Sequence, residues 1–133
     1  LLCLDIDYFK KYNDIFGHPA GDEVLRTISD ALKSYCARST DYVFRMGGEE
    51  FCVIFSGNTV EESFEYAQEL IRKISKLAIK HTDDTVVTIS AGLVTSKVID
   101  TDDEKALYKY ADDALYEAKQ NGRNQVVLSK KSK

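Results

Sequence analysis

Four acidic side chains stand at two points where this sequence predicts a strand end and a tight turn. They are Asp5, Asp7, Glu49 and Glu50. Alternate side chains of an extended strand share a face, so Asp5 and Asp7 are expected on one face of a strand over residues 1–8. Carboxylate oxygens are the ligands that hard divalent cations prefer. The two acidic pairs therefore indicate a metal site where the strand end meets the turn; the alternative is that they are ordinary solvated acids.

A tight hairpin is expected over residues 42–55. Gly47 and Gly48 stand between two strand-like runs, 42–46 and 51–55. Both turn positions of such a hairpin take positive φ, which glycine adopts without a steric cost. The tip carries no bulk and has two carboxylates directly behind it. Such a tip would allow a phosphate and a metal to approach the backbone closely.

The rest of the chain alternates helical and strand-like patterns. Apolar residues recur at helical spacing over 22–36, 59–79 and 104–121, and further strands are expected over 86–93 and 125–128. Residues 94–103 are expected to form a loop and 129–133 a frayed basic tail. Asp22 is expected to cap its helix, and Asn121-Gly122 to end the last one. Helices between and after strands, with one hairpin, predict an α+β fold.

Composition limits the classes of function. A chain of 133 residues makes one domain with a substantial core. Its formal net charge of −4 argues against nucleic acid as a partner. No apolar run approaches the ~18 residues of a membrane-spanning helix, so no membrane contact is expected. Cys3, Cys36 and Cys52 lie in apolar surroundings without metal-binding spacing, and we interpret them as buried reduced thiols of a cytoplasmic protein.

The segment Arg-Met-Gly-Gly-Glu-Glu-Phe over residues 45–51 resembles the signature hairpin of the GGDEF family, the diguanylate cyclase domains of bacterial signalling. Four further segments match that family in order, at 5–14, 17–22, 88–92 and 111–124. The resemblance covers essentially the whole chain. It implies a central, mostly antiparallel sheet flanked by helices, related to nucleotide cyclases and the polymerase palm (a ferredoxin-like plait).

The resemblance also has consequences for domain organisation. Family members usually carry a helix before the first strand and a sensor or receiver domain before that helix. We therefore expect residues 1–133 to be a single GGDEF domain taken from a longer protein, without its lead-in helix and its regulatory domain.

The activity that the resemblance implies is condensation of two GTP into cyclic di-GMP, with release of pyrophosphate. Each domain would hold one GTP, so the active species would be a homodimer. The family pattern implies Mg²⁺, with Mn²⁺ as a possible substitute, held by Asp5, Glu49 and the main-chain carbonyl of Ile6. Glu49 and Glu50 are the candidate catalytic carboxylates, and Glu49 could also take a proton from the attacking hydroxyl. Asp7 and Glu50 are left open between metal ligands and structural carboxylates.

The substrate contacts implied by the resemblance come from four segments. They are Phe9, Lys10, Asn13, His18, Asp22, Gly47, Gly48, Lys119 and Arg123. Lys10 and the first N–H groups of its helix, with Lys119 and Arg123, would bind phosphates. Asn13 and Asp22 would read the guanine edge, where a carboxylate can accept from donors that adenine lacks; this favours GTP over ATP. The alternatives are that Lys119 and Arg123 are surface cations and that His18 is structural.

A last motif suggests regulation. Arg38 and Asp41 form an Arg-x-x-Asp pattern whose Asp41 stands four residues before Arg45. In the family this spacing resembles an inhibitory site for the product, to which Arg45, and also Arg72, would add further guanidinium contacts. The alternative is a salt bridge within a turn.

Two rival functions remain open at this point. One is a catalytically silent module that binds GTP or cyclic di-GMP. The other is a GTP-binding regulatory partner fused to a phosphodiesterase domain. The first is not favoured by the residues, because the hairpin and Asp5 are both intact. Only sequence beyond Lys133 could support the second, and the short basic tail gives no indication of it.

Overall fold

The computed structural model describes residues 1–56, 59–82, 84–96 and 103–130. In chain order the elements are β1 (Leu2–Ile6), α1 (Phe9–Phe16), α2 (His18–Tyr35), β2 (Tyr42–Gly47), β3 (Glu50–Ile54), α3 (Val60–Lys76), β4 (Ile89–Leu93), α4 (Glu104–Gln120) and β5 (Val126–Leu128). They form one sheet in the order β2-β3-β1-β4-β5. The predicted α+β fold is confirmed.

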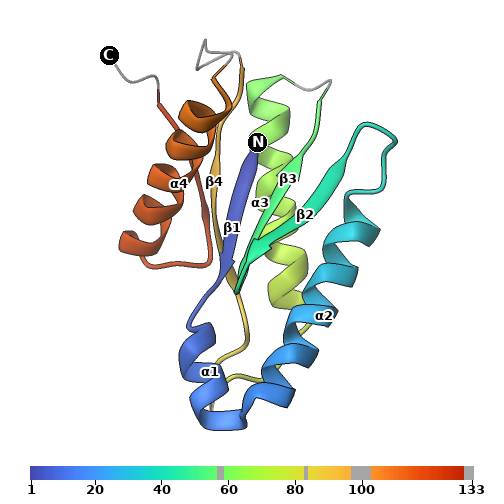
Figure 1. Cartoon of the computed structure of the whole chain (residues 1–133), viewed down its shortest axis with the longest axis vertical. Coiled ribbons are helices and arrows are strands. Elements are labelled where there is room, and N and C mark those ends of the chain that lie inside the picture. Colours follow the sequence, from blue (N-terminus) through green and yellow to red (C-terminus); the bar gives the residue numbers. More distant parts are fainter. Residues whose placement is uncertain (57–58, 83, 97–102, 131–133) are drawn as a thin grey trace.

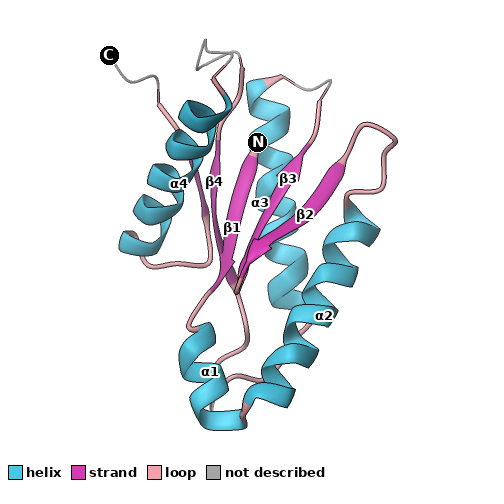
Figure 2. Ribbon diagram, in the orientation of Figure 1, coloured by secondary structure: helices cyan, strands magenta, loops and turns pink. Residues whose placement is uncertain are grey.

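The sheet is mostly antiparallel, as predicted. β1 pairs antiparallel with both β3 and β4, and β2 pairs antiparallel with β3. The edge strand β5 pairs parallel with β4. Figure 2 shows the hairpin tip between β2 and β3 lying beside the carboxyl end of β1. The topology thus brings the two predicted acidic segments to one end of the sheet.

The two faces of the sheet bury different helices (Figure 1). Leu2, Leu4 and Ile6 of β1 point into the main core, which α2 and α3 complete through residues such as Ile28 and Leu70. The alternate residues of β1 point to the opposite face, where Cys3 packs with Cys52 and with Ala111 of α4. Because side chains alternate along a strand, Asp5 shares the α4 face with Cys3.

Helix α2 begins earlier than expected, and Asp22 does not cap it. The helix starts at His18 after Gly17, whose φ of 88° suits glycine, and Pro19 occupies its first turn. Proline fits the first turn of a helix because no N–H is required there and its φ is already helical. Residues 18–21, which were expected to precede the helix, are therefore its first turn, and Asp22 lies one turn inside it.

Other boundaries moved by a few residues. α3 ends at Lys76 rather than at 79, and its N-cap is Thr59, which forms a capping box with Glu62. β4 begins at Ile89, since Val86 makes only an isolated bridge with Lys80. The expected loop over 94–103 and tail over 129–133 lie partly outside the described residues. Within the described part Ser129 is not frayed: its N–H donates to the carbonyl of Leu93 at 2.8 Å.

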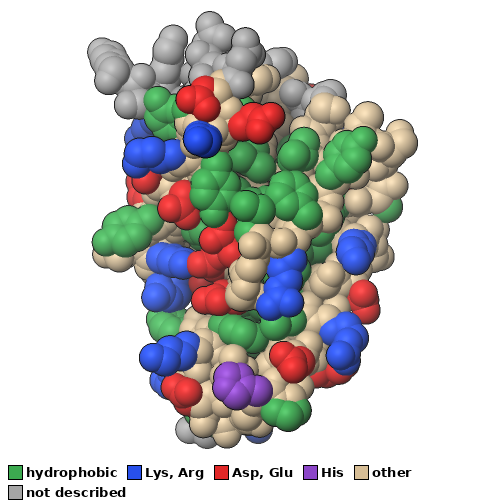
Figure 3. All heavy atoms as spheres, viewed as in Figure 1, with side chains coloured by type: hydrophobic (Ala, Val, Ile, Leu, Met, Phe, Trp, Pro, Cys, Tyr) green, Lys and Arg blue, Asp and Glu red, His purple; other side chains and the backbone are tan. Residues whose placement is uncertain are grey.

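The α4 face of β2 and β3 carries an apolar groove of about 890 Å³, lined among others by Phe44, Met46 and Ile54. Figure 3 shows hydrophobic side chains gathered on this side of the molecule. The three cysteines are free and buried, as predicted. None of the helices described is both long and apolar enough to cross a membrane.

Candidate active site

Two carboxylates face each other across the central strands. Asp5 of β1 stands directly opposite Glu50 of β3 in the antiparallel register. The N–H of Ile6 donates to the carbonyl of Glu49 at 3.2 Å, which makes Ile6 and Glu49 a hydrogen-bonded pair. Hydrogen-bonded and non-hydrogen-bonded residue pairs alternate along an antiparallel ladder, and side chains are closest at the non-hydrogen-bonded pairs. Asp5 and Glu50 form a non-hydrogen-bonded pair, so their side chains are neighbours on the face of the sheet that α4 covers.

Helix α4 supplies a partner to each of these carboxylates. Lys119 donates to Asp5 Oδ2 in a partly buried ion pair. One turn from the start of the helix, the Tyr108 hydroxyl donates to Glu50 Oε1. Burial raises the pKa of the Glu50 carboxyl, the Tyr108 hydrogen bond lowers it, and the charge of Asp5 raises it further. The position of α4 therefore controls the charge balance of the pair.

The second oxygen of Asp5 fits a metal ion. Asp5 Oδ1 is buried and has no hydrogen-bond partner among the described residues. A buried carboxylate oxygen without a partner is costly unless a ligand satisfies it. The part of the chain that the structure describes holds no group of three His, Cys, Asp or Glu residues in metal-binding arrangement. Mg²⁺ usually takes one or two carboxylates and completes its coordination shell with water and phosphate. Asp5 and Glu49, with the carbonyl of Ile6, are therefore a suitable set of ligands for it.

The other predicted ligands adjoin Asp5. Glu49 precedes β3 at the hairpin tip and is half-buried, and its backbone is hydrogen-bonded to Ile6. Both glycines have the expected positive φ, 149° at Gly47 and 52° at Gly48, but the turn lies one residue later than expected: Gly47 ends β2 and pairs with Glu50, so Gly48 and Glu49 are the turn residues. A Cβ added at either glycine would meet nothing within 4 Å. The space that glycine leaves at the tip is thus open to a ligand.

Asp7, whose role was left open, is structural. It is 3% exposed and accepts from Ser90 Oγ at 2.6 Å and Thr88 Oγ1 at 2.7 Å. The N–H of Asn124 donates to the same carboxylate at 3.1 Å. Both oxygens are therefore engaged, and Asp7 ties β1 to β4 and to the loop after α4.

That loop carries Arg123 to the start of α1. Arg123 and Asn124 both have positive φ, and the Arg123 guanidinium lies 4.6 Å from the centre of the Tyr8 ring. Arg123 Nη1 also donates to the carbonyl of Lys119 at 3.3 Å. Two of the three predicted phosphate-binding cations, Lys119 and Arg123, therefore lie together, and Lys119 pairs with Asp5 at the end of β1.

The start of α1 is open to an anion only through its backbone and Lys10. Tyr8, the N-cap, has a left-handed φ of 54° and makes no side-chain cap. The side chain of Phe9 is 9% exposed and belongs to the main core. Phe9 therefore contributes no side-chain contact to a ligand, and only its N–H is available. Lys10 is exposed.

The predicted base-reading residues meet where α1 packs on α2. A Cβ at Gly21 would lie 1.7 Å from Asn13 Oδ1, so only glycine leaves room for the Asn13 side chain. Asn13 Oδ1 is buried and has no hydrogen-bond partner among the described residues. Asp22 follows Gly21 and is exposed, as is His18. The Gly21-Asp22 pair thus positions an unsatisfied amide beside an accessible carboxylate.

Arg38 and Asp41 form the turn salt bridge that was the alternative reading of their motif. Arg38 Nη2 lies 3.2 Å from Asp41 Oδ1, and Arg38 Nε donates to Asp41 Oδ2 at 3.2 Å. The Tyr66 hydroxyl also donates to Asp41 Oδ2 at 3.4 Å. Arg45 lies with the hairpin instead, because its Nε donates to the carbonyl of Gly48 at 2.8 Å. Arg72, rather than Arg45, lines the pocket beside Arg38.

Sequence reasoning missed Tyr108 and Tyr66. A signal existed for Tyr108: it precedes Lys119 by 11 residues, which is close to three helical turns and puts both on one face of α4. No local signal existed for Tyr66, because its contact with Asp41 spans 25 residues of chain.

The fold and this geometry define an α+β domain with an acidic site at the end of its central strands, flanked by cations suited to phosphate. Residues 1–125 match the family described as "Diguanylate cyclase, GGDEF domain". The chain belongs to the GGDEF family.

Known relatives agree with this assignment. The chain is 41% identical to Diguanylate cyclase A of Treponema denticola over 98% of its own length and 35% of that protein. It is 36% identical to the Escherichia coli K12 diguanylate cyclase DosC over 99% of its length and 28% of DosC. It therefore spans about a third of the curated relatives it matches.

Solved structures extend the likeness to the fold. The active GGEEF domain of a diguanylate cyclase from Vibrio cholerae matches with a TM-score of 0.84 and 31% identity, over 98% of this chain and 82% of that one. The GGDEF domain of DgcB from Caulobacter crescentus, solved in complex with c-di-GMP, matches with a TM-score of 0.83 and 30% identity. That match covers 96% of this chain and 75% of the DgcB chain.

Proposed function

We propose that this chain is a diguanylate cyclase domain that condenses two GTP into cyclic di-GMP and releases two pyrophosphates. The observation that carries this proposal is the Asp5–Glu50 pair at the hairpin, with one buried Asp5 oxygen lacking a partner. Family membership gives the reaction class, and these two carboxylates are where its charge would be handled. A silent binding module is not favoured, because the signature hairpin and Asp5 are both intact.

The reaction joins a ribose 3′-hydroxyl to the α-phosphorus of a second GTP. The new P–O bond forms as the bond to the β-phosphate oxygen breaks, and pyrophosphate leaves. Glu49 accepts the hydroxyl proton. Mg²⁺, or Mn²⁺ in its place, would be held by Asp5, Glu49 and the carbonyl of Ile6, and it would stabilise negative charge on the phosphoryl oxygens. Glu50 supports this arrangement from the position opposite Asp5.

Each end of the GTP has its own partners. Lys10, Lys119 and Arg123, with the first N–H groups of α1, bind the phosphates. Asn13 and Asp22 accept and donate at the guanine edge, with His18 nearby on α2. Gly47 and Gly48 let the hairpin backbone approach the nucleotide.

The active unit is a homodimer, since one site holds one GTP and the product contains two. The two domains meet with their hairpins facing each other in the cytoplasm, where GTP is abundant. Specific activity should therefore rise with protein concentration and with fusion to a dimerising coiled coil. A flat activity profile down to nanomolar protein would contradict a limiting dimerisation step.

Arg38 and Asp41 form part of a second site, where bound product inhibits the enzyme. This part of the proposal is supported by DgcB, a relative solved in complex with c-di-GMP. The motif precedes β2, while the hairpin tip follows it. Product bound there would not compete with GTP, and inhibition is expected to be non-competitive.

The direct test is incubation of the purified, coiled-coil-fused chain with GTP and Mg²⁺, followed by chromatography for cyclic di-GMP. Asp5→Asn is the control, because it removes a charge at the site while keeping the side-chain shape. Product from the wild type and none from Asp5→Asn supports the proposal. Binding of GTP without any product from the fused wild type would instead indicate a silent module.

A further inference from the structure

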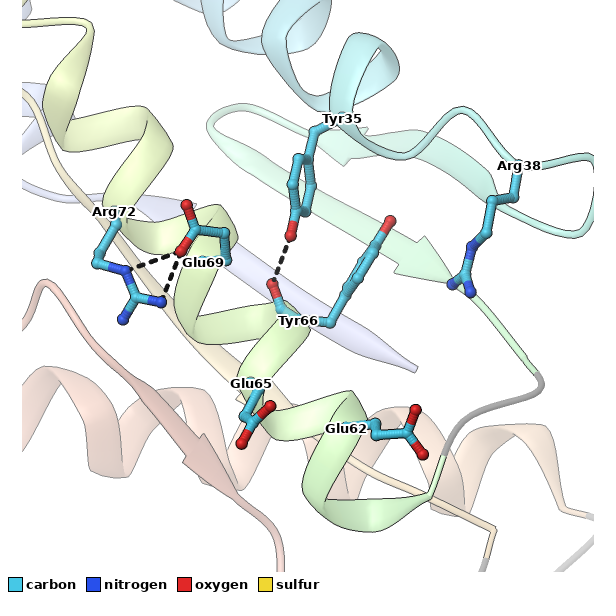
Figure 4. A pocket seen from close by; sticks show the side chains of 7 residues that line it. All are labelled: Tyr35, Arg38, Glu62, Glu65, Tyr66, Glu69 and Arg72. Atoms are coloured by element: carbon cyan, nitrogen blue, oxygen red, sulfur yellow. Dashed lines mark hydrogen bonds and ion pairs between the residues drawn. The ribbon is translucent and has the colours of Figure 1, made fainter.

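A pocket of about 430 Å³ lies beside the Arg38–Asp41 turn, between the end of α2 and the outer face of α3. Figure 4 shows its walls: Tyr35 and Tyr66 stand between Arg38 on one side and Arg72 on the other. The same pocket is lined by three glutamates of α3, which are Glu62, Glu65 and Glu69. Two guanidinium groups and two tyrosine rings would suit a stacked guanine or a phosphate.

Arg72 is engaged by its own helix. Its Nε donates to Glu69 Oε2 at 3.0 Å and its Nη2 donates to the same oxygen at 2.6 Å, as the dashed lines in Figure 4 mark. The pair is three residues apart on α3. The Arg72 hydrogen bond is also the main cause of the lowered pKa of the Glu69 carboxyl. An anion that binds Arg72 must therefore displace Glu69 or share the guanidinium with it.

The remaining charges of the pocket also disfavour an anion. Arg38 is paired with Asp41, so each arginine is matched by a carboxylate. Two glutamates of the pocket remain without a cation. Glu62 accepts from the N–H of Thr59 at the start of α3, and Glu65 is exposed. Among the described residues, neither has an ion-pair partner. The pocket wall thus carries net negative charge. These carboxylates would weaken the binding of cyclic di-GMP, which carries two phosphodiester charges, to the two arginines.

We propose that Glu69 weakens product feedback in this domain by holding Arg72 in an ion pair, so that the pocket beside Arg38 binds cyclic di-GMP only poorly. This inference rests on the proposed function, because it takes the product as the pocket's ligand. Glu69 acts through Arg72: it lowers the affinity of the pocket for cyclic di-GMP and does not contact the reacting atoms.

Glu69→Gln tests the idea with little change in shape. Glutamine keeps the length of the side chain and a good helix propensity, but removes the charge that holds Arg72. A guanidinium freed for one charge-assisted hydrogen bond to product should tighten binding by about tenfold, the low end of such contacts at an exposed site. If the tighter binding of cyclic di-GMP depends on Arg72, the double variant Glu69→Gln/Arg72→Ala should not show it.

The experiment is calorimetric titration of cyclic di-GMP into the full chain in the absence of divalent metal. Glu23→Gln is the matched control, because Glu23 pairs with Arg26 in the same i,i+3 geometry on α2, outside this pocket. We expect tighter binding in Glu69→Gln alone. Equal affinity in wild type and Glu69→Gln, no binding to either, or a gain that survives Arg72→Ala would each overturn the inference. Cyclase activity is measured separately, so a chain that makes no product would refute the proposed function without altering the binding comparison.

Discussion

Gly92 is the residue whose replacement should most clearly disturb the site from a distance. It lies on β4 directly beneath α4, and an added Cβ would stand 2.1 Å from the carbonyl oxygen of Ala111 and 2.4 Å from the amide nitrogen of Leu115. Both atoms belong to the helix backbone, so no side-chain rotation relieves the contact. Gly92→Ala is therefore expected to push α4 away from the sheet.

The size of the effect follows from the same distances. Ordinary contacts of a Cβ begin at 3.4 Å, so α4 would have to move by about 1 Å. A gap of that size forfeits a quarter to a half of the dispersion energy of the buried face of α4, and we expect a cost of about 3 kcal/mol in the free energy of unfolding. Turnover should fall too, because α4 carries Lys119 to Asp5 and Tyr108 to Glu50.

Urea unfolding followed by circular dichroism measures this cost. With a slope of about 2 kcal/mol per molar urea, the midpoint should fall by about 1.5 M. Ala114→Gly, which removes the nearby methyl at 2.9 Å, should not rescue Gly92→Ala, because the shortest contacts are with backbone. Alanine in a strand normally costs less than glycine. A Gly92→Ala protein as stable as the wild type would therefore refute the reasoning.

Three further substitutions test other parts of the site. Asp7→Ala leaves the Thr88 and Ser90 hydroxyls without their acceptor and removes one acceptor of the Asn124 N–H, so it should lower the free energy of unfolding by about 3 kcal/mol in urea titrations; an unchanged stability would contradict its structural role. Asp22→Ser should weaken discrimination against ATP at least tenfold in competition assays, and a preserved GTP preference would remove Asp22 from base reading. Tyr108→Phe removes the hydrogen bond that lowers the pKa of Glu50, so that pKa should rise in a ¹³C NMR titration of the carboxyl; an unchanged pKa would show that the bond is not formed in solution.

The elements were predictable because their patterns are local, whereas their pairing was not. The hairpin around Gly47-Gly48 follows from backbone conformations that glycine favours, and it was predicted to within one residue. That Asp5 faces Glu50 depends on β1 pairing with β3, a contact between distant segments that no local pattern encodes. The start of α2 was misplaced because Asp22 was taken as the cap, whereas Gly17 and Pro19 mark the true start of the helix.

For the candidate active site, too, local features were predictable from the sequence and contacts between distant segments were not. Residue types at the hairpin and strand end indicated the metal and phosphate chemistry. The role of Asp7 could not be settled from the strand alone, because its two hydroxyl donors come from β4 and the residue before it. Phe9 was expected to contribute its main-chain N–H, and the burial of its side chain in the core is compatible with that role. The ion pair of Arg72 with Glu69 is local and could have been read from their i,i+3 spacing.

The central claim is that the carboxylates around Asp5 convert GTP into cyclic di-GMP, with Glu49 taking part in the chemistry. The most direct measurement quantifies cyclic di-GMP and pyrophosphate together, for the dimer-fused wild type and for Glu49→Gln, with circular dichroism to establish that both are folded. The account predicts two pyrophosphates for each cyclic di-GMP in the wild type and neither product from Glu49→Gln. A folded Glu49→Gln protein that turns GTP over at the wild-type rate would contradict it.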